Sequence, residues 1–596
     1  MASSGWTRKS TLAALHTKRE SVWELAEVEN WDLVKYTAWT WACIIAILFA
    51  YRVALLAIFT LRRVANLSSS GAESSKQLYF ATPSENWAKF KRHWLIAPLF
   101  RTRHMREFRL SAALNVGTLP SRIQTFWLAG YFALNVATVV VAIDWTQDRP
   151  MWLSQLSNRM GVISTVNMIP LFILAGRNNP FIRLLDISFD NYNLLHRWIG
   201  RVVVIEAFLH GAFWVAATVI WKGWDGVSKE LNVMYDMPIT GTVGVGAFVL
   251  ILLQSVSIVR HAFYETFLHV HLLLALVASI AIWMHLTEDP HQNLVLGAII
   301  CWGFERLYRF FTILRVNIGQ GVTHAEVEAL PGEAMKVTLR VVRPWRFKPG
   351  QHVYLYMPSV GLWTSHPFTI AWSQGATNYP DEKGLPSRNQ DVLSRNSKST
   401  HMSLIIRRRT GFTDRLWQKA ERSPSGKFIA KAFVEGPYGC KNFKSYGTVM
   451  LWAAGVGITQ QVPHVRDLVR AYANGTCATR RVTLVWIIQS PEHLEWIRPW
   501  MTEILGMEKR REILRIQLFV TKPRSMKEIH SPSASVQMFP GRPNPAALVE
   551  REQQLQVGAM AVSCCGTGSL SDALRRAVRD RCEISEVDFF EEVYSW

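Results

Sequence analysis

Seven long apolar segments lie in the N-terminal part of the sequence, and they constrain the fold of this chain more than any other feature. A helix needs about 20 mainly apolar residues to cross the hydrocarbon core of a bilayer. Segments that meet this requirement lie near 39–61, 124–143, 158–175, 192–221, 240–258, 263–287 and 292–315. We therefore expect a multidomain membrane protein whose first large domain, 39–316, is a seven-helix transmembrane bundle.

The stretch between the first two apolar segments, residues 62–123, is strongly basic. Basic loops stay on the cytoplasmic side of a membrane. This loop is therefore predicted to be cytoplasmic, the segment 1–38 extracytoplasmic, and everything after residue 316 cytoplasmic. The loop is either a solvated face that also touches anionic lipid or a surface for a specific partner. The net charge of +21 would suggest nucleic acid in a soluble protein, but the basic residues flank apolar segments, which argues against that partner.

Two of the apolar segments carry paired histidines at the same spacing. The interval from His196 to His210 equals the interval from His271 to His285, and in a helix it corresponds to about four turns. This spacing leaves both side chains on one face, about 21 Å apart along the axis. Two such helices side by side would present one facing pair near each membrane surface, and each pair could ligate a haem iron from both sides. A single buried histidine more often forms hydrogen bonds within a bundle, but two matched pairs favour haem.

The motifs HRWIGR and YETFLHVH, together with the spaced histidines, resemble the ferric reductase-like transmembrane domain. Fungal ferric/cupric reductases and NADPH oxidases share this domain. The resemblance implies two b-type haems, an inner one held by His196 and His271 and an outer one held by His210 and His285. The seven predicted segments look more like the fungal metalloreductase branch.

Residues 317–445 contain short β-rich runs with the motifs KPGQ, HPFT, RRRTGFT and EGPYG in that order. This set is similar to the antiparallel FAD-binding β-barrel of the ferredoxin reductase superfamily. The resemblance implies contacts with the isoalloxazine and ribityl chain from His366, Pro367, Phe368 and Thr369. It implies contacts with the pyrophosphate from Arg408, Gly411 and Thr413, because arginine and backbone amides donate hydrogen bonds to oxyanions.

From 446 to 596 strands and helices alternate, as in an α/β nucleotide-binding domain. Two Gly-rich turns between a strand and a helix resemble the NAD(P) domain of the same superfamily. The residues implied to bind the nucleotide are Gly455, Gly457, Ile458, Thr459, Gly566 and Gly568. The resemblance places Cys565 near the nicotinamide, with a small buried thiol as the alternative, and Trp596 over the flavin. Gln489 stands where an arginine for the 2′-phosphate is frequent, so NADPH rather than NADH rests on the resemblance.

Together these features predict an electron path from NADPH through FAD and two haems to an acceptor outside the membrane. The acceptor is expected to be a ferric or cupric chelate, and the plasma membrane is the expected location. An NADPH oxidase-like enzyme that reduces O₂ to superoxide shares every motif and is the alternative. A transporter or scaffold without cofactors is disfavoured, since both histidine pairs and both nucleotide signatures are intact.

Overall fold

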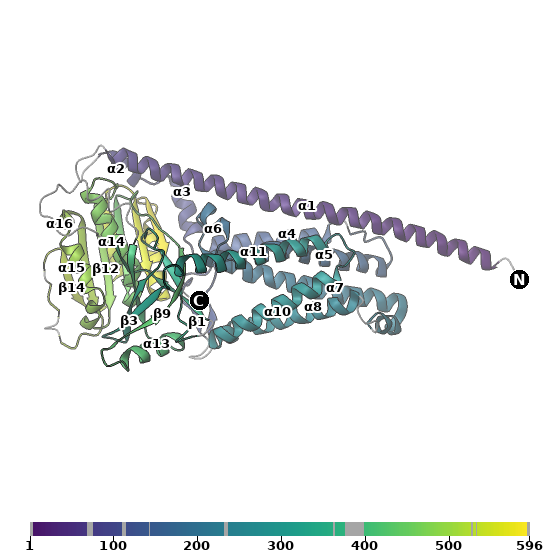
Figure 1. Ribbon diagram of the computed structural model, residues 1–596. Helices are drawn as coiled ribbons and strands as arrows, with labels where there is room; N and C mark the ends of the chain where they lie inside the picture. The colour runs from purple at the N-terminus through teal and green to yellow at the C-terminus, as the bar shows by residue number, and fades with distance from the viewer. Residues whose placement is uncertain are drawn as a thin grey trace. The chain divides into compact units, whose positions relative to one another are not determined.

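The computed structural model divides into two compact units (Figure 1). Unit 1 comprises residues 1–54, 111–115 and 126–307, and unit 2 comprises 55–110, 116–125 and 308–596. The structure describes residues 4–67, 75–109, 115–141, 143–231, 237–361, 364–375, 399–525, 529–531 and 533–592.

Each of the seven apolar segments lies in a long helix. These helices are α1 (Ser4–Leu67), α4 (Arg122–Val140), α5 (Arg149–Ala175), α7 (Phe189–Leu231), α8 (Met237–Gln254), α10 (Tyr264–His285) and α11 (Gln292–Asn317). Within the described residues, five of them (α1, α4, α5, α7 and α10) are long and apolar enough to cross a membrane, and α8 is apolar but shorter. The sequence of α11 contains Glu305, Arg306 and Arg309. A membrane domain with several apolar helices is therefore present, and the count of seven crossings stays a prediction.

The core of unit 1 forms where α5 and α7 pack along each other. Ile199 and Val203 of α7 and Met168 of α5 are almost fully buried there, and Tyr131 of α4 joins them. The short helices α6 (Pro180–Leu185) and α9 (Ser257–Ala262) connect the longer ones. Gly223, at φ 69°, interrupts the helical backbone of α7 just after the apolar segment 192–221.

Two antiparallel sheets in unit 2 enclose one hydrophobic core. One contains β7 (Trp372–Gly375), β8 (Ser399–Arg407), β4 (Ala334–Arg340), β3 (His324–Leu330) and β9 (Lys427–Lys431); the other contains β10 (Phe433–Tyr438), β5 (His352–Tyr356) and β6 (Ser365–Thr369). Met335, Val337 and Leu339 alternate inward from β4, as the two-residue period of a strand requires. The helix α13 (Phe412–Glu421) buries Leu416 against the same core. Closure of the two sheets into a barrel stays a prediction.

A six-stranded parallel sheet forms the rest of unit 2. Its order is β14 (Val536–Pro540), β13 (Leu514–Val520), β12 (Arg481–Ile488), β11 (Thr448–Ala454), β15 (Met560–Cys565) and β16 (Val587–Glu591). Its helices are α14 (Ile458–Ala473), α15 (Arg498–Leu505), α16 (Arg510–Ile513), α17 (Pro545–Gln554) and α18 (Gly568–Arg581), with η2 (Gly455–Gly457) and η3 (Pro491–Trp496). The strand order reverses between β11 and β15. In open α/β sheets ligands bind beyond the carboxyl ends of the strands at such a switch point.

The basic segment 62–123 is folded in part. The expectation of a solvated face is wrong at Lys91, which is buried. The segment contains α2 (Ser75–Ala81), α3 (Glu85–Phe90), η1 (Lys91–Leu95), β1 (Phe108–Arg109) and β2 (Asn115–Gly117). Lys91 is 1% exposed, and its Nζ lies 3.0 Å from carboxylate oxygens of both Glu586 and Asp588. Burial alone would lower the pKa of Lys91, but Asp588 and Glu586 outweigh it and hold the pKa above its ordinary value. The lysine is therefore a charged part of the folded core.

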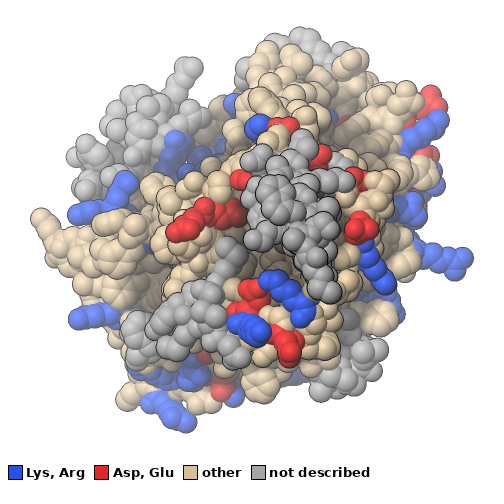
Figure 2. Space-filling model, turned by 90° about the vertical axis from the view of Figure 1, so that its right-hand side faces the viewer, with Lys and Arg blue, Asp and Glu red and all other residues tan. Residues whose placement is uncertain are grey.

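Charged side chains on the face shown in Figure 2 are interspersed rather than sorted by sign. Lys and Arg lie among Asp, Glu and a majority of uncharged residues there. The excess of basic residues thus forms no single patch among the described residues of that face. The expectation that nucleic acid is not a partner stays a prediction.

Candidate functional site

The four paired histidines meet as the sequence predicts, two by two, between α7 and α10. The ring centroids of His196 and His271 are 6.3 Å apart, with the rings inclined by 69°. Those of His210 and His285 are 6.0 Å apart, with the rings inclined by 76°. Unit 1 therefore contains two facing histidine pairs, separated by about four turns of each helix.

Hydrogen bonds fix the orientation of three of these rings. Nδ1 of His196 lies 3.0 Å from the carbonyl oxygen of Leu171, and Nδ1 of His210 lies 2.8 Å from that of Ser157. The side-chain amide of Gln254 lies 3.3 Å from Nδ1 of His271. The carbonyl acceptors at His196 and His210 favour the tautomer with the proton on Nδ1, which leaves Nε2 of these two rings for a metal. Backbone carbonyls have no sequence signal, so these partners were not predictable.

Two glycines approach the second pair closely. A Cβ atom added at Gly161 would lie 2.9 Å from Nδ1 of His210, and one added at Gly241 would lie 2.8 Å from Cε1 of His285. Real Cβ contacts are longer, so any larger residue would push the rings. Both glycines belong to the site, and sequence reasoning missed them because an isolated Gly in an apolar helix has many other uses. In the part of the chain that the structure describes, no group of three or more His, Cys, Asp or Glu residues could hold a metal ion.

The HPFT motif lies in β6, where two of its rings contact the start of α13. The ring of His366 stacks on Phe412 with centroids 4.7 Å apart, and Phe368 stacks on the same ring at 6.5 Å. Thr369 is buried at the end of the strand, and Pro367 pairs with Tyr354 of β5. The four residues thus form one edge strand beside the first turn of α13.

The turn before α13 has the backbone of an anion-binding site. Gly411 stands at φ 74° immediately before the helix, and no atom lies within 4 Å of a Cβ placed there. The Oγ1 of Thr413 accepts a hydrogen bond of 2.9 Å from the backbone N–H of Arg409. The guanidinium of Arg408 points elsewhere, since Nε donates to Asp414 at 2.6 Å. A phosphate at this helix start would thus meet backbone amides.

The two Gly-rich turns of the parallel sheet meet at its switch point. Gly455 follows β11 at φ 54°, and its carbonyl accepts a 3.0 Å hydrogen bond from Nε1 of Trp486. A Cβ at Gly457 would lie only 2.1 Å from the carbonyl oxygen of Cys565. Only glycine permits that approach. Ile458 and Thr459 then begin α14, and Thr459 Oγ1 donates to the carbonyl of Val456 at 2.9 Å.

Cys565 ends β15 with its side chain almost wholly buried. Burial, with a smaller contribution from Glu592, raises the pKa of its thiol to about 12. The group therefore stays a neutral thiol at physiological pH, which fits a packing role better than nucleophilic chemistry. Gly566 comes next, and a Cβ there would lie 2.9 Å from Cβ of Ala454 at the end of β11. Trp596 lies outside the described residues.

The basic segment packs against the start of α18, which sequence reasoning did not anticipate. The carboxylate of Asp572 accepts hydrogen bonds of 3.1, 2.9 and 3.1 Å from the backbone N–H groups of His104, Met105 and Arg106. A Cβ at Gly568 would lie 2.2 Å from the carbonyl oxygen of Met105. Gly568 was predicted to face a nucleotide; in the structure this loop is its nearest neighbour outside the turn.

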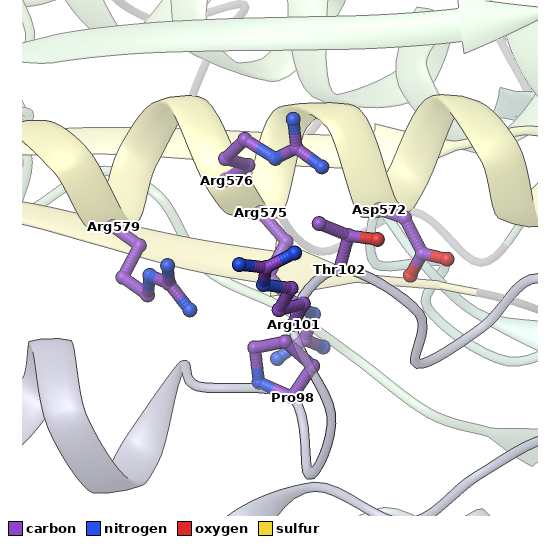
Figure 3. A pocket seen from close by; sticks show the side chains of 7 residues that line it. All are labelled: Pro98, Arg101, Thr102, Asp572, Arg575, Arg576 and Arg579. Atoms are coloured by element: carbon purple, nitrogen blue, oxygen red, sulfur yellow. The ribbon is translucent and has the colours of Figure 1, made fainter.

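A shallow basic pocket opens beside this contact (Figure 3). Its lining is Pro98, Arg101, Thr102, Asp572, Arg575, Arg576 and Arg579. Arg575 is largely buried, with hydrogen bonds to the carbonyl of Ile96 and to Glu591. These contacts tie the loop to the last strand of the sheet, β16.

Comparisons with known families match all three parts of the chain. Residues 160–282 match the ferric reductase like transmembrane component, 320–383 an FAD-binding domain, and 446–579 the ferric reductase NAD binding domain. The first match includes three of the paired histidines and stops just before His285.

Curated relatives extend over more of the chain. The ferric/cupric reductase transmembrane component 2 of Saccharomyces cerevisiae is 23% identical over 553 residues, which are 85% of this chain and 71% of that protein. Ferric reductase transmembrane component 3 of the same yeast is 25% identical over 550 residues, 85% of this chain and 72% of that protein. The probable cell surface ferric reductase kap2 of Aspergillus oryzae is 29% identical over 460 residues, 72% of this chain and 58% of that protein. The chain therefore contains a ferric reductase-like transmembrane domain followed by FAD-binding and NAD-binding domains, and it is similar to fungal ferric and cupric reductases over most of its length.

Proposed function

We propose that the protein carries electrons across a membrane, from NADPH through FAD and two b-type haems to a ferric or cupric chelate on the other side. The observation that carries this proposal is the pair of histidine–histidine distances in unit 1. The three matched domains support the order of the path, and the names of the relatives support a metal chelate as acceptor.

The facing histidines fit a haem iron in their spacing. Two bonds of about 2 Å from a metal to imidazole nitrogen, plus the half-widths of two rings, give a centroid separation of roughly 6 Å. The observed separations are 6.3 and 6.0 Å. The carbonyl acceptors at Nδ1 of His196 and His210 leave Nε2 of these two rings as the nitrogen for iron. His196 and His271 would hold one haem, and His210 and His285 the other.

The chain supplies the geometry of the crossing. A haem with both axial positions filled supplies one-electron transfer rather than binding of O₂ at iron. The shared histidine spacing within α7 and α10 corresponds to about 21 Å along a helix axis. Two sites at that spacing divide a hydrocarbon layer of about 30 Å into shorter steps.

In unit 2 the residues that would hold FAD and NADPH are those that the motifs singled out. His366, Pro367, Phe368 and Thr369 would line the flavin, and the amides at Gly411 and Thr413 would meet its diphosphate. Gly455, Gly457, Ile458, Thr459 and Gly566 would surround the nicotinamide nucleotide, with Cys565 beside its ring. Arg408 would act through Asp414, which it holds in the first turn of α13.

The basic segment 62–123 would face the cytoplasm together with unit 2, the N-terminal segment would lie outside, and the plasma membrane would be the location. The name of the Aspergillus relative, a cell surface ferric reductase, supports this placement. An oxidase that passes the electrons to O₂ remains the rival, because both reactions need the same residues on the path.

Reduction of a membrane-impermeant ferric chelate by protein in sealed vesicles tests the proposal. The nucleotide-binding half should face outward, NADPH should be added outside, and the chelate should be enclosed. We expect reduction of the enclosed iron at the same rate with and without superoxide dismutase. Loss of the reduction with dismutase would replace the metal with O₂ as acceptor, and no reduction in either case would contradict a transmembrane path.

A further inference from the structure

A chain of buried polar side chains lies between α4, α5 and α7. Glu206 of α7 is 5% exposed, and its Oε2 accepts a 3.1 Å hydrogen bond from Nδ2 of Asn167 on α5. The same nitrogen donates to Oδ1 of Asn135 on α4 at 2.6 Å, and Asn135 donates to the carbonyl of Tyr131 at 2.7 Å. This cluster belongs to the membrane domain, and neither the histidine pairs nor the nucleotide motifs account for it.

Glu206 differs from Glu435, another buried carboxylate among the described residues. Glu435 of β10 is 0% exposed, and the guanidinium of Arg309 donates to both of its oxygens at 2.9 Å. Within the described residues Glu206 has no ion pair. Arg159 of α5 bonds instead to the carbonyl of Val141 and to Glu29, and Arg201 of α7 lies over the ring of Trp198 at 4.4 Å.

An unpaired carboxylate in a membrane interior is costly, and such groups usually have a function. Among the described residues, Tyr131 of α4 is close enough to interact electrostatically with Glu206, and Asn167 of α5 is its neutral hydrogen-bond donor. His210 follows one helical turn later on α7. A change of charge at His210 would thus act on Glu206 across about 6 Å of helix rise.

We propose that Glu206 binds one proton when an electron reaches the iron held by His210 and His285, and releases it when that electron leaves. This inference rests on the proposed function. With one electron added at the site that His210 and His285 would hold, the carboxylate of Glu206 would take up one proton from water, so the net charge of the region would be unchanged. When the external acceptor then takes the electron, the proton would return to water. Glu206 is therefore a residue that tunes the second site rather than a ligand.

The coupled uptake of one electron and one proton has a physical reason. A charge added in a medium of low dielectric interacts strongly with its neighbours, so a nearby proton acceptor lowers the cost of each electron that enters. His196, of the first pair, lies almost three helical turns from Glu206 along α7, whereas His210 lies about one turn away. The coupling should therefore act mainly on the second site.

Spectroscopic redox titration of the purified full-length protein, from pH 5 to 9, tests the proposal. In the wild type we expect the midpoint potential of one of the two haems to fall as the pH rises, by up to about 59 mV for each tenfold drop in proton concentration. Glu206→Gln should abolish that dependence, whereas Glu206→Asp should retain it. Glu305→Gln is the matched control, since Glu305 of the same unit interacts with Arg306 and Asn178, and it should titrate like the wild type.

Infrared difference spectra between oxidised and reduced protein provide a second readout. We expect a carboxyl band that appears on reduction in the wild type and is missing in Glu206→Gln. A potential independent of pH in the wild type, or an unchanged dependence in Glu206→Gln, would overturn the role of Glu206 while leaving the electron path intact. A preparation with full FAD and no haem spectrum would instead overturn the proposed function.

Discussion

The two histidine pairs of unit 1 and the lysine–carboxylate cluster of unit 2 are both buried polar systems, yet they are encoded in opposite ways. The histidines recur at one spacing on two helices, so local periodicity alone brings them to shared faces. Lys91 meets Glu586 and Asp588 across 495 and 497 residues of sequence. No periodic pattern marks that lysine, which stands among many basic residues of one segment.

The difference shows where the burial of a charged or polar residue can be predicted from the sequence. Inside an apolar helix a single polar residue is conspicuous, because the cost of burial forces it to have a partner or a function. In a basic loop each lysine resembles the others, and only the tertiary structure shows which one is buried. The first system would hold the irons of the proposed electron path, and the second fixes a loop on the last strand of the parallel sheet.

Removal of one imidazole should produce the largest effect. His210→Ala leaves His285 without its facing ring, so we expect loss of one of two haems and complete loss of electron transfer to an outside acceptor. Haem content per FAD, measured by absorbance, should halve, while reduction of FAD by NADPH stays normal. His269→Ala is the control, because His269 is exposed and bonds to the carbonyl of Glu265 in its own helix. Retention of both haems in His210→Ala would contradict the assignment.

Disruption of the cluster of Lys91, Glu586 and Asp588 should have a smaller effect on electron transfer, but it should lower the free energy of unfolding of unit 2. Lys91→Met leaves the carboxylates of Glu586 and Asp588 with only the more distant guanidinium of Arg62, at 3.6 and 4.0 Å. We expect a loss of unfolding free energy toward the about 3–5 kcal/mol that is typical of a broken buried pair. Thermal unfolding followed by flavin fluorescence measures the loss. Lys89→Met, which removes an exposed pair with Glu85 in the neighbouring helix turn, should leave the transition unchanged. Equal effects of the two variants would show that burial of Lys91 is not what matters.

A third effect depends on pH and concerns His464, which packs on Phe443 with ring centroids 4.7 Å apart. Burial, assisted by Lys444, lowers the pKa of His464 from 6.5 to about 3. Between these two values the unfolded chain therefore binds more protons than the folded chain. As the pH is lowered below 6.5, the free energy of unfolding decreases by about 1.4 kcal/mol per pH unit.

Replacement of this ring by an apolar one tests that slope. His464→Leu should flatten the dependence of the unfolding midpoint on pH between about 6.5 and 4, although its stability at neutral pH falls somewhat. His530→Leu, on an exposed loop position of the same unit, is the control and should keep the wild-type slope. An unchanged slope in His464→Leu would contradict the buried, neutral state of the ring.

The smallest effect should follow from Gly568→Ala. The added methyl would meet the carbonyl of Met105, so the loop must move, at a cost of about 1–3 kcal/mol. Limited proteolysis should show faster cleavage near residue 105. Gly506→Ala, where the added atom meets only ordinary contacts at 3.5 Å, should not. Identical cleavage of both variants would show that the loop does not depend on this contact.

Much of the fold followed from the sequence, for identifiable reasons. Apolar length predicted every long helix of unit 1, but the charges of α11 and the shortness of α8 leave the number of crossings a prediction. The glycines of the switch point were found because each follows an apolar strand. The contact between the loop at His104 and Met105 and helix α18 was not predicted. The loop donates hydrogen bonds to Asp572 from backbone N–H groups, which every residue has and which therefore leave no pattern in the sequence.

The number of haems per chain, together with their ligation, tests the central claim most directly. Quantitative haem analysis and electron paramagnetic resonance of the purified oxidised protein should show two haems for each FAD, both low-spin with two imidazole ligands. One haem, none, or a high-spin signal with an open axial position in the unmodified chain would contradict the two facing pairs as iron sites.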